Sequence, residues 1–130
     1  MKVSVLEVSE MVGMVFNRIT VLENAILFFR DNADTIVMLH EQQCCEDVYL
    51  ESIVGDIQDL VDSPILFAEE SNNSDNTEDG SYTWTFYKFR TRKGYVDIRW
   101  YGESNGYYSE EAIVLAVKPD YVQKLLTGKE

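Results

Sequence analysis

The chemically versatile side chains of this chain gather in one short segment, residues 40–46, with the sequence HEQQCCE. It holds the chain's one histidine, His40, and both cysteines, Cys44 and Cys45, followed by Glu46. Imidazole, thiolate and carboxylate groups bind Zn²⁺ in tetrahedral sites, so these four residues are candidate metal ligands. Their spacing fits poorly, because there is no C-x2-C pair and adjacent cysteines share one metal with difficulty. We therefore expect a structural segment that holds no metal and no cofactor.

The same segment also contains the groups of a thiol nucleophile. A Cys–His pair oriented by Glu41 or Glu46 would match the arrangement of thiol-dependent enzymes. A reactive cysteine needs an electropositive setting, whereas the acidic residues around this pair would raise a thiol pKa. No P-loop, dinucleotide-binding glycine motif or H-E-x-x-H motif occurs in the chain. The sequence therefore favours a non-enzymatic protein without a catalytic residue.

A second group of candidate contact residues lies in a loop that follows a long β-hairpin. The loop combines polar and aromatic side chains, namely Glu103, Ser104, Asn105, Tyr107 and Tyr108. Aromatic residues dominate binding hot spots, and polar loop residues are frequent contacts. Trp84 and Trp100 are expected in the β core, whereas Tyr107 and Tyr108 suit binding and packing equally well.

Charge is the strongest signal in the composition. The chain has 23 acidic and 11 basic residues, which gives a net charge of −12 at pH 7. Such a charge repels nucleic-acid phosphates, so direct nucleic-acid binding is not expected. From Asp31 to Tyr87 the chain has fourteen carboxylates and no Lys or Arg. We expect this excess to form an acidic face that binds a basic protein through Asp56, Asp59 and Asp62.

The length and composition indicate one folded domain, residues 1–130, with 45% hydrophobic residues. No apolar run approaches the ~18 residues of a membrane-spanning helix, so no membrane partner is expected. The first residues lack the pattern of a signal peptide. Adjacent cysteines would close only a small strained ring, so Cys44 and Cys45 are expected to be free thiols in a reducing cytosol. We therefore expect a cytoplasmic protein, whose oligomeric state the sequence leaves open.

Short β-rich segments separated by turn residues predict an α+β fold, a mainly antiparallel β sheet with two or three short helices. The longest predicted hairpin joins residues 82–91 to residues 95–101 and places Val96, Ile98 and Trp100 on its core face.

Shorter elements surround this hairpin. Further strands are expected over residues 3–6, 14–22, 25–30, 35–41, 48–53, 64–68 and 112–117. The second to fourth of these should form a meander. Short helices are expected at residues 10–12 after the cap Ser9, at residues 57–62 after the cap Asp56, and at residues 118–128. Residues 69–80 have no apolar side chain and are expected to form a flexible acidic loop.

Two stretches, HEQQCCEDVYLESIVGDIQDLVDSPIL and WTFYKFRTRKGYVDIRWYGESNGYYSE, resemble a family of small uncharacterised proteins, a domain of unknown function found largely in bacteriophages and prophages. The resemblance covers Leu6 to Glu111 and departs at Lys118 to Glu130. It implies a phage setting but no assigned activity and no catalytic residue. The matching residues are His40, Glu41, Cys44, Cys45, Glu46, Asp56, Trp84, Trp100, Tyr101, Glu103, Ser104, Asn105, Tyr107 and Tyr108.

The phage setting implies a role in host takeover or counter-defence. Together with the charge, it leads to the hypothesis of a non-enzymatic acidic protein that binds a host or defence-system protein in the host cytosol. Such a protein could imitate nucleic acid toward a basic, nucleic-acid-binding partner. The alternative is a small-ligand or metal-binding protein that uses His40 to Glu46 together with Tyr107 and Tyr108.

Overall fold

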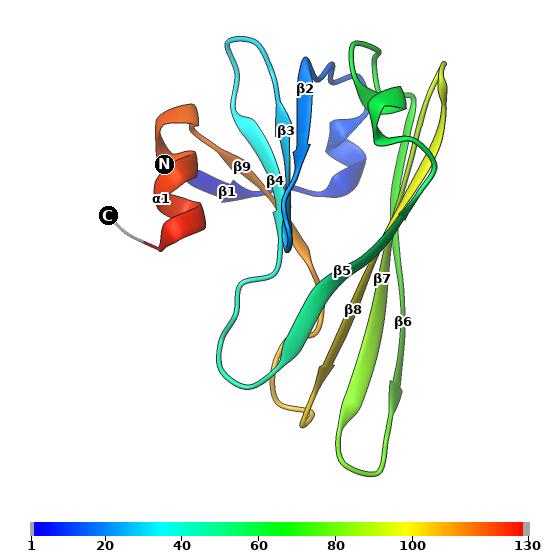
Figure 1. The fold of residues 1–130 in the computed structure, drawn as a ribbon, viewed down its shortest axis with the longest axis vertical. Coiled ribbons are helices and arrows are strands. Elements are labelled where there is room, and N and C mark those ends of the chain that lie inside the picture. Colours follow the sequence, from blue (N-terminus) through cyan, green and yellow to red (C-terminus); the bar gives the residue numbers. More distant parts are fainter. Residues whose placement is uncertain (1, 129–130) are drawn as a thin grey trace.

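The computed structural model describes residues 2–128 and arranges them in two antiparallel sheets (Figure 1). The five-stranded sheet has the order β1-β9-β4-β3-β2. Its strands, in that order, are Val3–Val5, Ile113–Val117, Thr35–Leu39, Ala25–Phe29 and Arg18–Val21. The four-stranded sheet has the order β5-β8-β7-β6. Its strands are Asp47–Val54, Gly94–Ser104, Ser81–Thr91 and Phe67–Asn76. The prediction of a mainly antiparallel β protein is confirmed, including the meander of β2, β3 and β4.

Helices are fewer than the two or three that the sequence predicted. Within residues 2–128 the structure has one α-helix, α1 (Val122–Thr127), and three 3-10 segments. The 3-10 segments are η1 (Val8–Met11), η2 (Ile57–Leu60) and η3 (Pro119–Tyr121). Asp56 caps η2 as expected, because its carboxylate accepts from the Gln58 N–H at 3.0 Å. The segment ends after one turn, since Val61 is extended and Asp62 adopts a φ of 60°. The segment Lys118 to Glu130, in which the chain departs from the family it resembles, ends in residues 129–130, which lie outside the described residues.

At the N-terminus, the predicted cap is wrong by two residues. Glu7, not Ser9, caps η1, and its N–H donates to the Glu10 carboxylate at 2.8 Å. Among residues 2–128, no helix combines the length and the apolar character that a membrane crossing requires.

The hairpin of β7 and β8 is the longest paired unit of the fold. Its register runs from Ser81↔Ser104 to Thr91↔Gly94 without a shift. Val96, Ile98 and Trp100 are buried on the inner face of β8, as predicted. Trp84 is not in the core as expected, because it lies on the opposite face of β7 and is half-buried.

The main core lies between the two sheets. Phe28 on β3 packs between Phe16 and Phe89, with ring centroids 5.1 and 6.1 Å apart respectively. Tyr87 is also fully buried, and its hydroxyl donates to the Ala112 carbonyl at 3.0 Å. This contact ties β7 to the chain just before β9.

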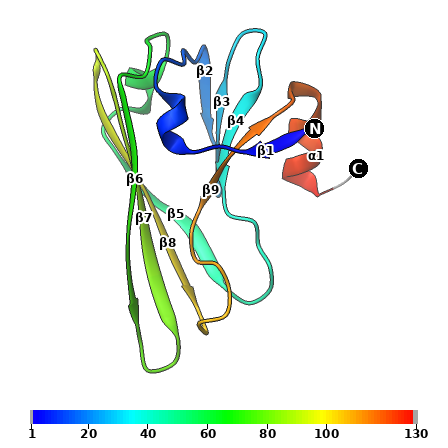
Figure 2. The ribbon, with the colours of Figure 1, turned by 180° about the vertical axis from the view of Figure 1, so that it is seen from behind.

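A second, smaller cluster covers the other face of the five-stranded sheet. Leu27, Val37 and Leu115 pack there with Val122 of α1. The molecule therefore has three layers, in which the five-stranded sheet separates α1 from the four-stranded sheet (Figure 2). Both figures show the four-stranded sheet extending well beyond the five-stranded sheet at one end.

The flexible acidic loop predicted at residues 69–80 is largely a strand. Residues 69–76 belong to β6, which pairs with β7 from Phe67↔Arg90 to Asn76↔Ser81. Only residues 77–80 turn, and the Thr77 N–H donates to the Gly80 carbonyl at 2.7 Å. The prediction failed because every side chain from 69 to 79 is exposed, so pairing with β7, and not burial, orders this segment.

The two tryptophans provide a test of this partition between inner and outer faces. Trp100→Ala removes a fully buried side chain and should lower the free energy of unfolding by about 3–5 kcal/mol. Trp84→Ala, on the half-buried outer face, should cost less than about 2 kcal/mol. Urea unfolding followed by circular dichroism measures both values, and a larger loss for Trp84→Ala would contradict the assignment of faces.

Candidate functional site

The candidate residues from the sequence lie at two opposite ends of the four-stranded sheet. Asp59 lies within η2, and Asp56 and Asp62 lie on either side of it, beside the β7–β8 turn. Thr91 of this turn donates to the Asp59 carbonyl at 2.5 Å. Lys93 from the same turn donates to the Val61 carbonyl at 2.6 Å. The three aspartates therefore share their end of the sheet with basic residues and do not form a purely acidic face.

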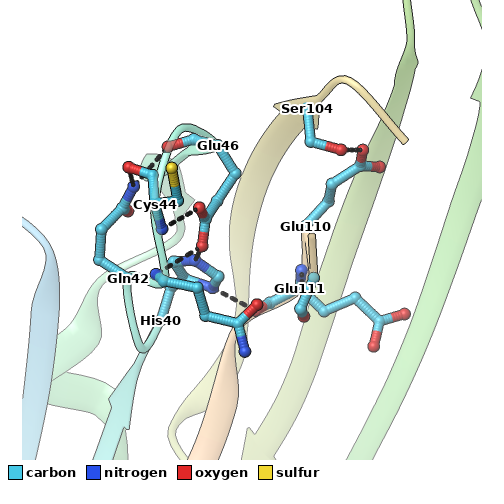
Figure 3. Close-up of polar contacts among 9 residues, drawn as sticks. His40, Gln42, Cys44, Glu46, Ser104, Glu110 and Glu111 are labelled. Atoms are coloured by element: carbon cyan, nitrogen blue, oxygen red, sulfur yellow. Dashed lines mark hydrogen bonds and ion pairs between the residues drawn. The ribbon is translucent and has the colours of Figure 1, made fainter. Parts of the chain in front are cut away.

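The segment from His40 to Glu46 and the tyrosine loop meet at the other end of the sheet (Figure 3). Glu46 organises this end, because the residue is only 4% exposed and its carboxylate accepts hydrogen bonds from the segment around it. The backbone N–H groups of Gln43 and Cys44 donate to it at 2.8 and 2.9 Å. Gln42 closes the turn by donating to the Glu46 carbonyl at 2.6 Å.

His40 links this turn to the segment before β9. Its Nδ1 lies 2.9 Å from the Glu111 carbonyl oxygen, and its Nε2 lies 2.9 Å from the Glu46 carboxylate. Both partners are oxygen acceptors, so the two ring nitrogens join the Glu46 turn to the segment before β9.

The Glu46 carboxylate is held in its charged form. Burial by itself would raise its pKa, but the N–H groups of Cys44 and Gln43, together with His40, lower the pKa from 4.5 to about 2. This carboxylate is saturated with internal donors, so its role is to fix the loop.

The prediction that Cys44 and Cys45 are free thiols is wrong. The two residues form a disulfide between neighbours, on a turn whose backbone the Glu46 carboxylate holds. Free thiols were the reason to expect a reducing cytosol, and the disulfide removes that reason. It also occupies both sulfurs of the proposed metal site, and residues 2–128 contain no group of three His, Cys, Asp or Glu side chains placed to bind a metal.

A second buried carboxylate, Glu110, anchors the tyrosine loop. One oxygen accepts from Thr83 at 2.9 Å, and the other accepts from Ser81 at 2.5 Å and from Ser104. Burial would raise the pKa of Glu110, and the three hydroxyl donors bring it below its usual value. Figure 3 shows Glu110 directed toward Ser104, while Glu111 follows it beside His40.

Gly102 allows the tyrosine loop to approach β8 closely. A Cβ atom at this position would clash with the Glu110 carbonyl oxygen and would lie 2.9 Å from Cγ2 of Val48. Gly102 lies just beyond the return strand predicted over residues 95–101, yet it is a paired residue of β8, opposite Thr83 and Val48.

The predicted loop residues are only partly brought together. Glu103, Ser104 and Asn105 line an open depression of about 340 Å³. Tyr107 projects into solvent with 86% exposure, and Tyr108 is half-buried. Residues that the sequence did not associate with the loop complete the lining, namely Cys45, Asp47, Thr77, Asp79 and Ser81.

Three carboxylates lie around this end of the sheet on its outer face. Asp47 pairs with Glu103, Glu103 pairs with Tyr82, and Tyr82 pairs with Asp75. Paired residues of neighbouring strands point to the same side, so Asp47, Asp75 and Glu103 share one face. All three side chains are exposed. We call them the acidic end.

A row of aromatic side chains continues from the acidic end along the outer face. Tyr101 lies at its centre, with ring centroids 4.9 Å from Trp84, 5.8 Å from Tyr49 and 6.2 Å from Tyr82. Phe86 stacks on Trp84 at 6.1 Å. We call these five residues the aromatic row. Burial, with the neighbouring Glu103, raises the pKa of Tyr101, whose hydroxyl donates to that carboxylate at 3.2 Å.

Sequence reasoning missed most of this surface. Tyr49, Tyr82 and Phe86 were not selected, although each alternates with a buried neighbour along its strand. Glu110 was also missed, because its three hydroxyl partners come from β7 and β8 and their convergence depends on the register of those strands.

Comparison with known proteins gives a family but no function. Residues 9–114 match the family described as a domain of unknown function, DUF7448. No curated protein and no solved structure matches the chain.

The pKa of Glu46 predicts how stability depends on pH. A carboxylate whose pKa is lowered on folding stabilises the protein above its unfolded pKa of 4.5, and this contribution is lost as the pH falls toward about 2. Glu46→Gln should lower the urea midpoint at pH 7 and flatten its decline in this acidic range. The exposed Glu41→Gln is the control and should change neither, while an unchanged decline in Glu46→Gln would contradict the assignment.

Because the tyrosine loop approaches Gly102 so closely, adding a single methyl group at this position should destabilise the fold. Gly102→Ala should lower the free energy of unfolding by about 1–3 kcal/mol, because the loop or β8 must shift to admit it. Urea unfolding measures the loss. Ser71→Ala, at an exposed position of β6, is the control and should be neutral. Equal stability of the two variants would show that the loop does not need its close contact with β8.

Proposed function

The chain belongs to the DUF7448 family of domains of unknown function, and we propose that it is a non-enzymatic protein that binds a basic protein partner. The contact surface in this proposal is the outer face of the four-stranded sheet, where the acidic end borders the aromatic row. The observation that carries the proposal is this juxtaposition of exposed carboxylates and half-exposed aromatic rings on one continuous face.

The chemistry of this face suits Lys and Arg side chains. Aromatic rings attract cations through their negatively charged faces, and nearby carboxylates add direct ion pairs. Trp and Tyr also supply the large contact areas typical of binding hot spots. Among residues 2–128, the ion pairs are His40–Glu46 and Lys118–Asp34, so the acidic end is not neutralised by the chain's own cations.

The two buried carboxylates support a non-enzymatic role. Glu46 and Glu110 are the carboxylates with the lowered pKa values, and their oxygens are engaged by backbone N–H groups, His40 and hydroxyl groups. They orient the loops at the rim of the contact surface and do not face the depression as unpaired acids or bases.

The partner proposed for this surface is a host or defence-system protein with a basic groove, such as a nucleic-acid-binding protein. A face that carries fixed carboxylates can occupy a groove that otherwise receives phosphates. Electrostatic complementarity of this kind raises the association rate and makes binding sensitive to salt. The phage setting implied by the resemblance motivates this choice of partner, and the net charge of −12 is consistent with it.

The proposal is tested by capture and by two matched triple variants. The immobilised protein should capture a basic protein from bacterial lysate at low salt, and mass spectrometry identifies that protein. Neutralising the acidic end with Asp47→Asn, Asp75→Asn and Glu103→Gln should then weaken binding of the purified partner about tenfold. Raising the salt should weaken wild-type binding strongly, since exposed charges are screened.

The control triple neutralises the aspartates at the opposite end of the sheet. Asp56→Asn, Asp59→Asn and Asp62→Asn change the net charge by the same amount. Asn also preserves the cap of η2 and tolerates the positive φ of residue 62. Isothermal titration calorimetry compares the two triples. Equal losses would contradict the acidic end as the contact surface, and failure to capture any basic protein would contradict the proposed function.

A further inference from the structure

Strand β6 leaves one long edge of the four-stranded sheet open. It pairs with β7 along Phe67–Asn76, without a register shift, and within residues 2–128 no strand lies on its other side. Helix η1 packs beside β6, and Figure 2 shows it next to the upper half of the strand, with the lower half clear of other elements. Side chains 69–79 are all exposed.

The register identifies the backbone groups that face the open edge. The Thr77 N–H bonds the Gly80 carbonyl, so the pairs Asp75↔Tyr82 and Asn73↔Trp84 also exchange hydrogen bonds with β7. In an antiparallel pair, alternate residues point their N–H and C=O groups away from the partner. By this alternation the outward groups of β6 belong to Ala68, Glu70, Asn72, Ser74 and Asn76. The Asn76 N–H already donates to the Asp75 carboxylate at 2.8 Å, so Asn72 and Ser74 offer their N–H groups along the lower half of the edge (Figure 2). An unprotected row of this kind is a template for another strand.

The inner side of this edge carries carboxylates that lack a cation. Asn72 donates to the Glu111 carboxylate at 3.2 Å, which places Glu111 beside β6. Partial desolvation of this exposed side chain raises the pKa of Glu70, and the charges of Glu111 and Glu7 raise it further. Within residues 2–128, no Lys, Arg or His forms an ion pair with any of these three glutamates. A strand added here would place a side chain close to Glu70.

The charges of β6 also decide against a second copy of this chain as the added strand. Glu69 and Asp75 lie on the outer side of β6, and Glu70 lies on the inner side. Pairing of two β6 strands would bring these carboxylates together, and like charges on neighbouring strands are destabilising. A strand that carries Lys or Arg meets attraction on both sides.

We propose that the open edge of β6 binds an extended segment of a basic partner as a fifth strand, with a Lys or Arg of that segment facing Glu70. The mode is β-strand addition, in which backbone hydrogen bonds supply affinity and alternate side chains supply specificity. The inference rests on the proposed function for the nature of the partner, and it adds how that partner is held.

The test uses the full chain and a ten-residue peptide of alternating Thr and Lys as the probe. Amide hydrogen exchange by NMR reports each position separately. Peptide binding should slow exchange at Asn72 and Ser74, which face the open edge, and should leave Asn73 and Asp75 unchanged because β7 already protects them. The same peptide with N-methyl groups on the amides of its pairing edge keeps its charge but cannot pair, so it should bind about tenfold more weakly.

Two substitutions of Ser74 test the backbone pairing while leaving the charge of the edge unchanged. Ser74→Pro removes an outward N–H from the open edge, where proline is tolerated in a sheet, and should weaken peptide binding about tenfold. Ser74→Ala loses the same hydroxyl contact with Thr83 but keeps the N–H, so its affinity should remain that of the wild type. An NMR spectrum of each variant confirms the fold.

Three results would overturn the proposal. These are equal affinity of the N-methylated peptide, equal affinity of Ser74→Pro and Ser74→Ala, and no saturable peptide binding. If the captured partner loses affinity with the neutralised acidic end but binds Ser74→Pro normally, strand addition is wrong and the proposed function stands. If no basic protein is captured while the peptide still protects Asn72 and Ser74, the edge pairs and the proposed function is wrong.

Discussion

The alternation of side chains along the β7–β8 hairpin is the constraint on which the rest of the structure depends. The same ladder places Tyr87, Phe89 and Trp100 in the core and Trp84 and Tyr101 on the outer face. A slip of one residue would exchange the two sets and place the aromatic row inside. The core and the proposed contact surface are therefore specified together, and neither can change its register without the other.

Two buried carboxylates hold the irregular end of the molecule to this sheet. Glu46 bonds backbone N–H groups and His40, whereas Glu110 bonds three hydroxyl groups. Burying a charge is costly unless it is fully hydrogen-bonded, so each carboxylate requires its loop to adopt one conformation. This requirement explains how segments without regular secondary structure can form a defined rim beside an exposed face.

Strands with alternating or apolar sequences could be predicted, and features that depend on pairing could not. Residues 25–30 and 35–41 were recognised because they are apolar and flanked by turns, and their strands match within two residues. Residues 69–76 were not recognised, since an exposed edge strand carries no hydrophobic pattern. At the site, Glu46 was selected for its chemistry, but its role became visible only once the turn brought N–H donors onto it.

The position of β9 sets the order in which the chain can be completed. The four-stranded sheet uses the continuous span from residue 47 to residue 104, so its strands can pair as soon as that span has been synthesised. In the five-stranded sheet, β9 lies between β1 and β4 and pairs with both. Strand β1 thus waits for β9, and β4 cannot gain its second neighbour until residues 113–117 have been synthesised.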